Sequence, residues 1–183
     1  VCFNERCRRK GDGADDYSAS GMRATADSAI GNERLLMPQI LNGLKKNEFI
    51  FLLQPQYELN TRKIIGAEAL VRWNHPALGE ISPAVFIPVL ENNGYITKLD
   101  QKIWEDVCAM IRRWIDEGVK PLAISINVTK TDLLAMDVVE IFDELLKKYR
   151  IPPKYLNIDI AENAYKEVYG IVSEVEKSLQ QKG

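Results

Sequence analysis

The pattern of hydrophobic and polar positions changes near residue 31 and divides the chain into two unlike parts. Residues 1–31 are rich in Gly, Asp, Ser and Arg and have few large apolar side chains. Such a segment is typical of a linker or of the tail of an upstream domain. Residues 32–46 have one apolar stripe at helical spacing, so we expect a connecting helix there.

Beyond that helix, short apolar runs alternate with longer amphipathic stretches. We expect strands at 49–54, 63–72, 122–128 and 155–161, a short helix near 83–92, and longer helices at 99–117, 131–149 and 164–181. Strands separated by amphipathic helices are typical of βα units around a parallel sheet. The predicted fold class is therefore α/β.

Three of the predicted strands have one aliphatic face and one small or polar face, because side chains alternate between faces along a strand. Near their C-terminal ends the polar faces carry Glu68, Asn127 and Asp159. In a (β/α) barrel the face away from the helices lines the lumen, and chemistry gathers at the C-terminal strand ends. Three oxygen ligands converging there would suit Mg²⁺ or Mn²⁺. The alternative is that they are unrelated residues that serve loops and caps.

Charge and cysteine content narrow the class of protein. The net charge of −2 is small and mixed, which argues against a nucleic-acid polymer or a membrane surface as partner. No apolar run approaches the roughly 20 residues of a membrane helix. Cys2, Cys7 and Cys108 are odd in number and lack metal-ligand spacing, and Cys108 is expected to be a buried core thiol. These features favour a reducing, cytoplasmic setting, even if a parent protein is membrane-anchored, and a first residue other than Met suggests a fragment.

The residues around Glu68 resemble a known family. The run GAEALVRWNHP at 66–76, preceded by Gln54 and Pro55 and followed by FIP at 86–88, is similar to the opening of an EAL domain. This domain is the catalytic module of bacterial cyclic-di-GMP phosphodiesterases. The resemblance covers about residues 46–183 and implies a partial TIM-like (β/α) barrel over 47–183. It implies that the chain ends before the fifth strand of the family's barrel.

The resemblance also implies roles for single residues in metal binding. Glu68 matches the motif glutamate and Asn127 the metal-binding asparagine, with Thr129 in place of the family's usual serine. Asp159 stands where the family has a third metal ligand, a glutamate, so its carboxylate is one methylene shorter. Glu162 matches an acidic residue that orders a loop.

A second set of matching residues concerns the nucleotide. Gln54, Leu70 and Arg72 match positions that contact the cyclic dinucleotide, and Arg72 is placed for a phosphate oxygen. A guanidinium fork suits that contact. The alternative is that Arg72 forms a surface ion pair. Asp100 and Glu105, at the start of a predicted helix, are expected to be solvated or to cap it.

The implied reaction is two-metal hydrolysis of one phosphodiester bond of cyclic di-GMP. The paired aspartates and the lysine of the family's later strands have no counterparts in this sequence, so we expect the chain alone to be inactive. The alternatives are a catalytically silent EAL module that senses cyclic di-GMP or binds a protein, and a dimerisation scaffold. Expected partners are an upstream GGDEF or sensor domain and, through an unpaired sheet edge, a second copy of the chain.

Overall fold

The computed structural model describes residues 33–160 and 162–182 of the 183-residue chain. The predicted linker at 1–31, with Cys2 and Cys7, lies outside the described residues. One sheet contains β1 (Phe49–Tyr57), β2 (Ile64–His75), β3 (Gly79–Ile81), β4 (Ala123–Val128) and β5 (Leu156–Ile160). The helices are α2 (Glu33–Lys45), α3 (Pro83–Asn92), α4 (Ile96–Asp116), α5 (Lys130–Ala135), α6 (Val138–Tyr149), the 3₁₀ helix η1 (Pro153–Tyr155), α7 (Glu162–Glu167) and α8 (Tyr169–Lys182). The predicted α/β class is confirmed.

The sheet is mixed, with the order β1-β2-β4-β5 and with β3 paired to β2. β1 and β2 form an antiparallel hairpin, whereas β2, β4 and β5 are parallel, as expected for strands connected through helices. Gly66 lies where β2 meets β4, and a Cβ atom there would lie 2.8 Å from the carbonyl oxygen of Ala123. The close approach of these two strands therefore depends on glycine.

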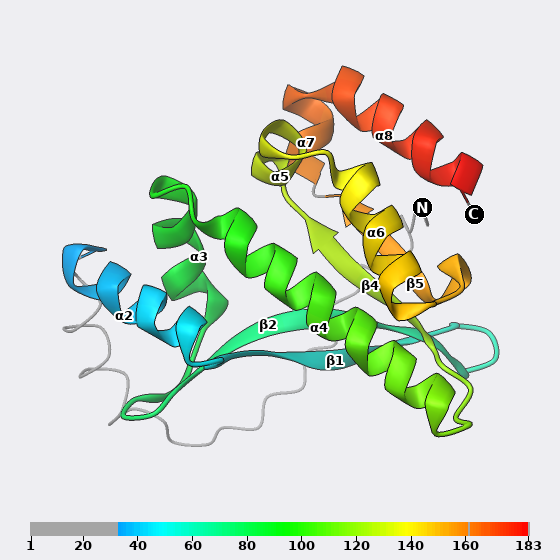
Figure 1. The fold of residues 1–183 in the computed structure, drawn as a ribbon, viewed down its shortest axis with the longest axis horizontal. Coiled ribbons are helices and arrows are strands. Elements are labelled where there is room, and N and C mark those ends of the chain that lie inside the picture. Colours follow the sequence, from blue (N-terminus) through cyan, green and yellow to red (C-terminus); the bar gives the residue numbers. More distant parts are fainter. Residues whose placement is uncertain (1–32, 161, 183) are drawn as a thin grey trace.

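The helices cover the aliphatic faces of the strands. Figure 1 shows α4 running across the sheet, with α2 and α3 at one end and α6 and α8 on the side of β4 and β5. The buried strand residues have the predicted parity: Ala67, Ala69, Ile124, Ile126 and Val128. The stripe of α4 packs against them with Leu99, Ile103, Trp104, Val107, Cys108 and Ile111. Cys108 is a buried free thiol, as predicted.

Helix α2 meets the sheet through a tightly packed turn. The indole Nε1 of Trp73 donates a hydrogen bond to Glu48 Oε2 over 3.1 Å, and the backbone N–H of Asn74 donates to the carbonyl of Glu48 over 2.8 Å. Trp73 also stacks on Phe49, with ring centroids 5.1 Å apart. A Cβ at Gly43 of α2 would lie 2.9 Å from Glu48 Oε2 and 3.0 Å from Trp73 Nε1, so a side chain there would displace this hydrogen bond.

Two of the predicted helices are each broken into a pair. The prediction of one helix at 131–149 is wrong, because Met136 is extended and Asp137 starts a new helix by accepting a hydrogen bond from the backbone N–H of Glu140 over 2.9 Å. The helix predicted at 164–181 is likewise α7 followed by α8. Among the described helices, none is long and apolar enough to cross a membrane.

Candidate metal and nucleotide site

Glu68 and Asn127 meet on the face of the sheet opposite the helices. Glu68 on β2 lies beside Ser125 on β4, and Asn127 follows two residues later, so its side chain points to the same face. Asn127 Nδ2 donates a hydrogen bond to Glu68 Oε1 over 3.0 Å, although the two residues are 59 positions apart. The structure thus brings together two of the three residues predicted from strand parity.

Asp159 completes this group from the neighbouring strand. It lies directly beside Asn127 in the parallel register of β4 and β5. Partial burial, and then the negative charge of Glu68, raise the pKa of Asp159 above its usual value. Two carboxylates and an amide therefore converge at one place on this face of the sheet.

The chemistry of this donor set fits a hard divalent cation. All three side chains can offer oxygen atoms, and oxygen ligands suit Mg²⁺ or Mn²⁺. Binding of such a cation would relieve the repulsion that raises the pKa of Asp159. In the described chain no group of three or more His, Cys, Asp or Glu side chains is arranged to hold a metal ion, and the candidate site itself has two such acids and an amide. Burial raises the pKa of the Cys108 thiol to about 12, so a thiolate ligand is not offered there.

The hairpin places the predicted nucleotide contacts beside the carboxylates. Gln54 on β1 is directly opposite Glu68 on β2, and Leu70 follows Glu68 on the same face. Gln54 is exposed and Leu70 is partly exposed. A ligand lying across the open face of β1 and β2 would therefore meet both residues next to the carboxylate of Glu68.

Arg72 lies further along β2 and already has a partner. Its Nε is 3.4 Å from Glu80 Oε1 on β3, and its Nη1 donates to the carbonyl of Val71 over 2.8 Å. The side chain of Arg72 is 24% exposed and that of Glu80 is 59% exposed. The ion pair raised as an alternative is thus present, and the guanidinium already uses its Nε and Nη1 atoms in these two contacts. Contact with a phosphate remains a prediction for Arg72.

The turn after Asn127 is fixed by a capping box that the sequence analysis did not identify. Asp132 Oδ2 accepts from the backbone N–H of Thr129 over 2.8 Å and from Thr129 Oγ1 over 2.6 Å. Thr129 Oγ1 accepts in turn from the backbone N–H of Asp132 over 3.2 Å. The signal was available, since a Thr followed three residues later by an acid is a known capping pattern.

Asp100 corrects a prediction. It was expected to be solvated or to cap α4, but its Oδ2 is buried and it interacts with Asp132. Glu105 accepts hydrogen bonds from Lys148 and Tyr149 of α6, which lower the pKa of Glu105. Asp100 and Glu105 therefore both make contacts between helices.

The segment after Asp159 is described in part. Ala161 lies outside the described residues, and Glu162 is the first residue of α7. The predicted role of Glu162 in ordering a loop stays a prediction.

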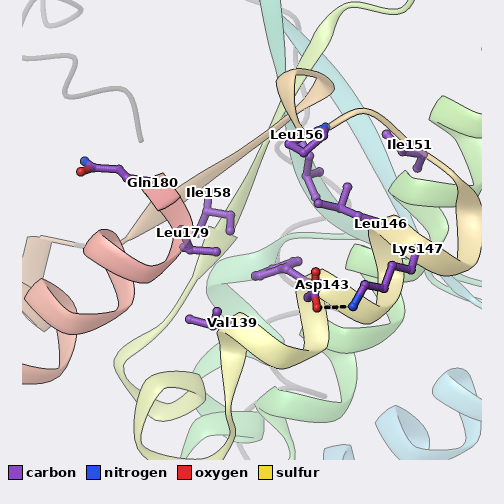
Figure 2. Close-up of a pocket in the computed structure, with 11 residues that line it drawn as sticks. Val139, Asp143, Leu146, Lys147, Ile151, Leu156, Ile158, Leu179 and Gln180 are labelled. Atoms are coloured by element: carbon purple, nitrogen blue, oxygen red, sulfur yellow. Dashed lines mark hydrogen bonds and ion pairs between the residues drawn. The ribbon is translucent and has the colours of Figure 1, made fainter. Parts of the chain in front are cut away.

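A large pocket lies on the other face of β5. It has a volume of about 420 Å³ and lies between α6, α8 and the aliphatic face of β5 that carries Leu156 and Ile158 (Figure 2). Its polar edge includes the ion pair between Lys147 Nζ and Asp143 Oδ2, at 2.7 Å. Because side chains alternate along the strand, Asp159 points away from this pocket. The pocket is therefore separate from the group formed by Glu68, Asn127 and Asp159.

Comparison with known proteins extends the local observations. The family model of the EAL domain matches residues 38–183. An uncharacterized protein of Mycobacterium tuberculosis is 34% identical over 122 residues, which are 66% of this chain and 40% of that protein. The cyclic di-GMP phosphodiesterase RocR of Pseudomonas aeruginosa is 30% identical over 141 residues, 77% of this chain and 34% of RocR. This chain thus spans less than half the length of these relatives.

Solved structures show the same fold. The structure titled as the phosphodiesterase PaMucR in complex with c-di-GMP has a TM-score of 0.76 and 24% identity, and the match covers 81% of this chain and 60% of that one. The FimX EAL domain of Xanthomonas citri, also in complex with c-diGMP, has a TM-score of 0.72 and 15% identity, covering 87% of this chain and 60% of the other. The sheet and helices described above therefore have the TIM-barrel-like fold of EAL domain structures.

Proposed function

The chain belongs to the EAL domain family, and we propose from that premise that it contributes the metal-binding and nucleotide-binding strands of a cyclic-di-GMP phosphodiesterase. The observation that carries the proposal is the convergence of Glu68, Asn127 and Asp159, with a hydrogen bond of 3.0 Å between the first two. The named relatives RocR and MucR, both cyclic di-GMP phosphodiesterases, support the choice of substrate. This nucleotide is an intracellular second messenger, so the proposal implies a cytoplasmic site.

The proposed reaction is hydrolysis of one phosphodiester bond to give the linear dinucleotide. Glu68, Asn127 and Asp159 would hold Mg²⁺ or Mn²⁺, which when bound would neutralise charge on the phosphate and activate water. Gln54 and Leu70 would position the nucleotide along the hairpin. The guanidinium of Arg72 would bind a phosphate oxygen through Nη2.

We also propose that this chain by itself binds cyclic di-GMP without hydrolysing it. Among the described residues, only three candidate ligands converge, whereas a two-metal site needs ligands for both ions. Asp159 has one methylene fewer than the glutamate it replaces, and a displacement of about 1 Å can cost on the order of 10²-fold in rate. MucR is named a bifunctional diguanylate cyclase and phosphodiesterase, which supports an upstream cyclase domain as a partner.

The short carboxylate of Asp159 and the engaged Arg72 favour a second candidate function, a silent module that senses cyclic di-GMP. The two candidate functions are distinguished by an assay. The purified chain is mixed with cyclic di-GMP and Mn²⁺, and the linear product is followed by chromatography. Binding without product supports the proposal for this chain. Measurable turnover would contradict the proposed inactivity.

Metal binding is tested with Mn²⁺ alone. We expect the paramagnetic resonance signal of free Mn²⁺ to fall on addition of the chain, and Glu68→Gln to weaken this binding at least about tenfold, since a neutral amide binds a cation less strongly. The matched control is Glu117→Gln, an exposed acid after the end of α4. Equal Mn²⁺ affinity of the Glu68 and Glu117 variants would overturn the assigned site.

A further inference from the structure

Two carboxyl groups from different helices meet beneath the candidate site. Asp132, the N3 residue of α5, is fully buried. Asp100 lies near the start of α4, a helix in contact with α5. Asp100 Oδ2 and Asp132 Oδ1 are both buried without a hydrogen-bond partner among the described residues, and the two carboxyl groups interact with each other. Two buried carboxylates side by side repel each other when both are ionised, whereas one proton held between them would give both of these oxygens a hydrogen-bond partner.

The donors around the pair decide which residue holds the proton. Asp132 Oδ2 accepts two hydrogen bonds from Thr129, which stabilise its ionised form. Asp100 Oδ2 has no such donor among the described residues, and the nearby Glu91 of α3 adds a further negative charge. Burial, then the charge of Asp132, raise the pKa of Asp100 to about 9. Burial also raises the pKa of Asp132, but the Thr129 and Asp100 hydrogen bonds oppose that shift.

The pair is joined to the site through the end of β4. Thr129, which Asp132 holds, is two residues beyond Asn127. Trp104, on the same helix as Asp100, donates a hydrogen bond from Nε1 to the carbonyl of Asn127 over 3.1 Å. Helix α4 therefore contacts the junction between β4 and α5 at Asn127 itself and, through Asp132, at Thr129 two residues later.

We infer that Asp100 is kept as a neutral carboxylic acid that donates a hydrogen bond to Asp132 and so fixes the junction that presents Asn127. Asp100 is a positioning residue, since it acts on the site through Asp132 and Thr129. The inference rests on the proposed function in one respect: that function gives Asn127 a cation to bind. Loss of the shared proton would leave two buried charges in contact and loosen the turn.

The first experiment monitors the junction between β4 and α5 in the absence of metal. The chain has three tryptophans, and Trp104→Phe identifies the indole N–H signal of Trp104 in a ¹⁵N-labelled sample. We expect this signal to shift in wild type as the pH rises through about 9, and to stay fixed in Asp100→Asn, whose amide donates without titrating. The control is Asp116→Asn, an exposed acid on the same helix, which should behave as wild type. A wild-type signal that does not move, or an Asp100→Asn signal that moves in the same way, would overturn the inference.

The second experiment measures how Asp100 affects Mn²⁺ binding at the candidate metal site. We expect Asp100→Ala to weaken Mn²⁺ binding about tenfold or more, in the range typical of residues that orient metal ligands, and Asp100→Asn to restore it. Equal losses in both variants would contradict a positioning role through hydrogen-bond donation. If wild type binds no Mn²⁺, the proposed function fails, while the indole experiment still decides the role of Asp100. The indole experiment does not use the Ala variant, so it still tests the role of Asp100 if Asp100→Ala does not fold.

Discussion

Trp104 donates a hydrogen bond from its indole Nε1 to the backbone carbonyl of Asn127 over 3.1 Å, and this bond ties the long helix α4 to the strand end that carries the amide of the site. Trp104 is itself buried against Phe142 of α6, with ring centroids 4.7 Å apart. A core aromatic residue thus has both a packing role and a role in holding the strand end.

Replacing Trp104 with Phe should therefore destabilise the fold and the site together. The variant loses a hydrogen bond and leaves a space beside Phe142, so we expect the free energy of unfolding to fall by about 2–3 kcal/mol in urea denaturation. Trp114→Phe, at a partly exposed position of the same helix, should cost less. Similar losses in the two variants would contradict a special role for Trp104.

The stability of the chain should depend on pH through Asp100. The folded chain keeps a proton on Asp100 up to about pH 9, whereas the unfolded chain releases it near 3.8. The folded state thus binds more protons between these values, so this contribution to stability is complete below the lower pKa and is lost as the pH rises toward the upper one.

Asp100→Asn removes that dependence. We expect its stability relative to wild type to rise by at least about 1 kcal/mol between pH 5 and pH 8, measured by chemical denaturation. Asp116→Asn should show no such trend, because Asp116 is exposed beside Arg112. A constant difference between Asp100→Asn and wild type at the two pH values would contradict the protonated pair.

Glu80 should limit access of a phosphate to Arg72. Because the pair is exposed on the Glu80 side, Glu80→Gln should change the free energy of unfolding by less than about 1 kcal/mol. The same change should strengthen binding of cyclic di-GMP several-fold in calorimetry, while Arg72→Ala should weaken it strongly. If Arg72→Ala binds as wild type does, Arg72 serves only the ion pair with Glu80.

Gly66 and Gly170 offer a matched test of the strand contact. Gly66→Ala places a methyl group against the carbonyl of Ala123 in the sheet, so we expect a loss of about 2 kcal/mol or more. Gly170 lies in α8 with nothing within 4 Å of a built Cβ, and Gly170→Ala should be neutral or stabilising by up to about 1 kcal/mol. Thermal denaturation of both variants checks the contrast.

Strand parity predicted the convergence of Glu68 and Asn127 because alternation of side chains and parallel register are short-range rules. The sequence raised an ion pair of Arg72 as an alternative but did not identify its partner. Glu80 lies in a strand of only three residues, which is too short to show a periodic pattern. The contact of Asp100 with Asp132 depends on how two helices pack, and no local pattern encodes that. The break at Asp137, by contrast, had a local signal in the acid three residues later.

The two pairs of residues in the candidate site are separated by different lengths of chain. Gln54 and Glu68 are joined by one hairpin, a short loop that closes at low entropic cost. Glu68 and Asn127 are 59 positions apart, and closing that longer loop costs roughly 1 kcal/mol more. We therefore expect the hairpin that carries the candidate nucleotide contacts to form early in folding, and the candidate cation ligands to assemble only after α4 has packed across the sheet.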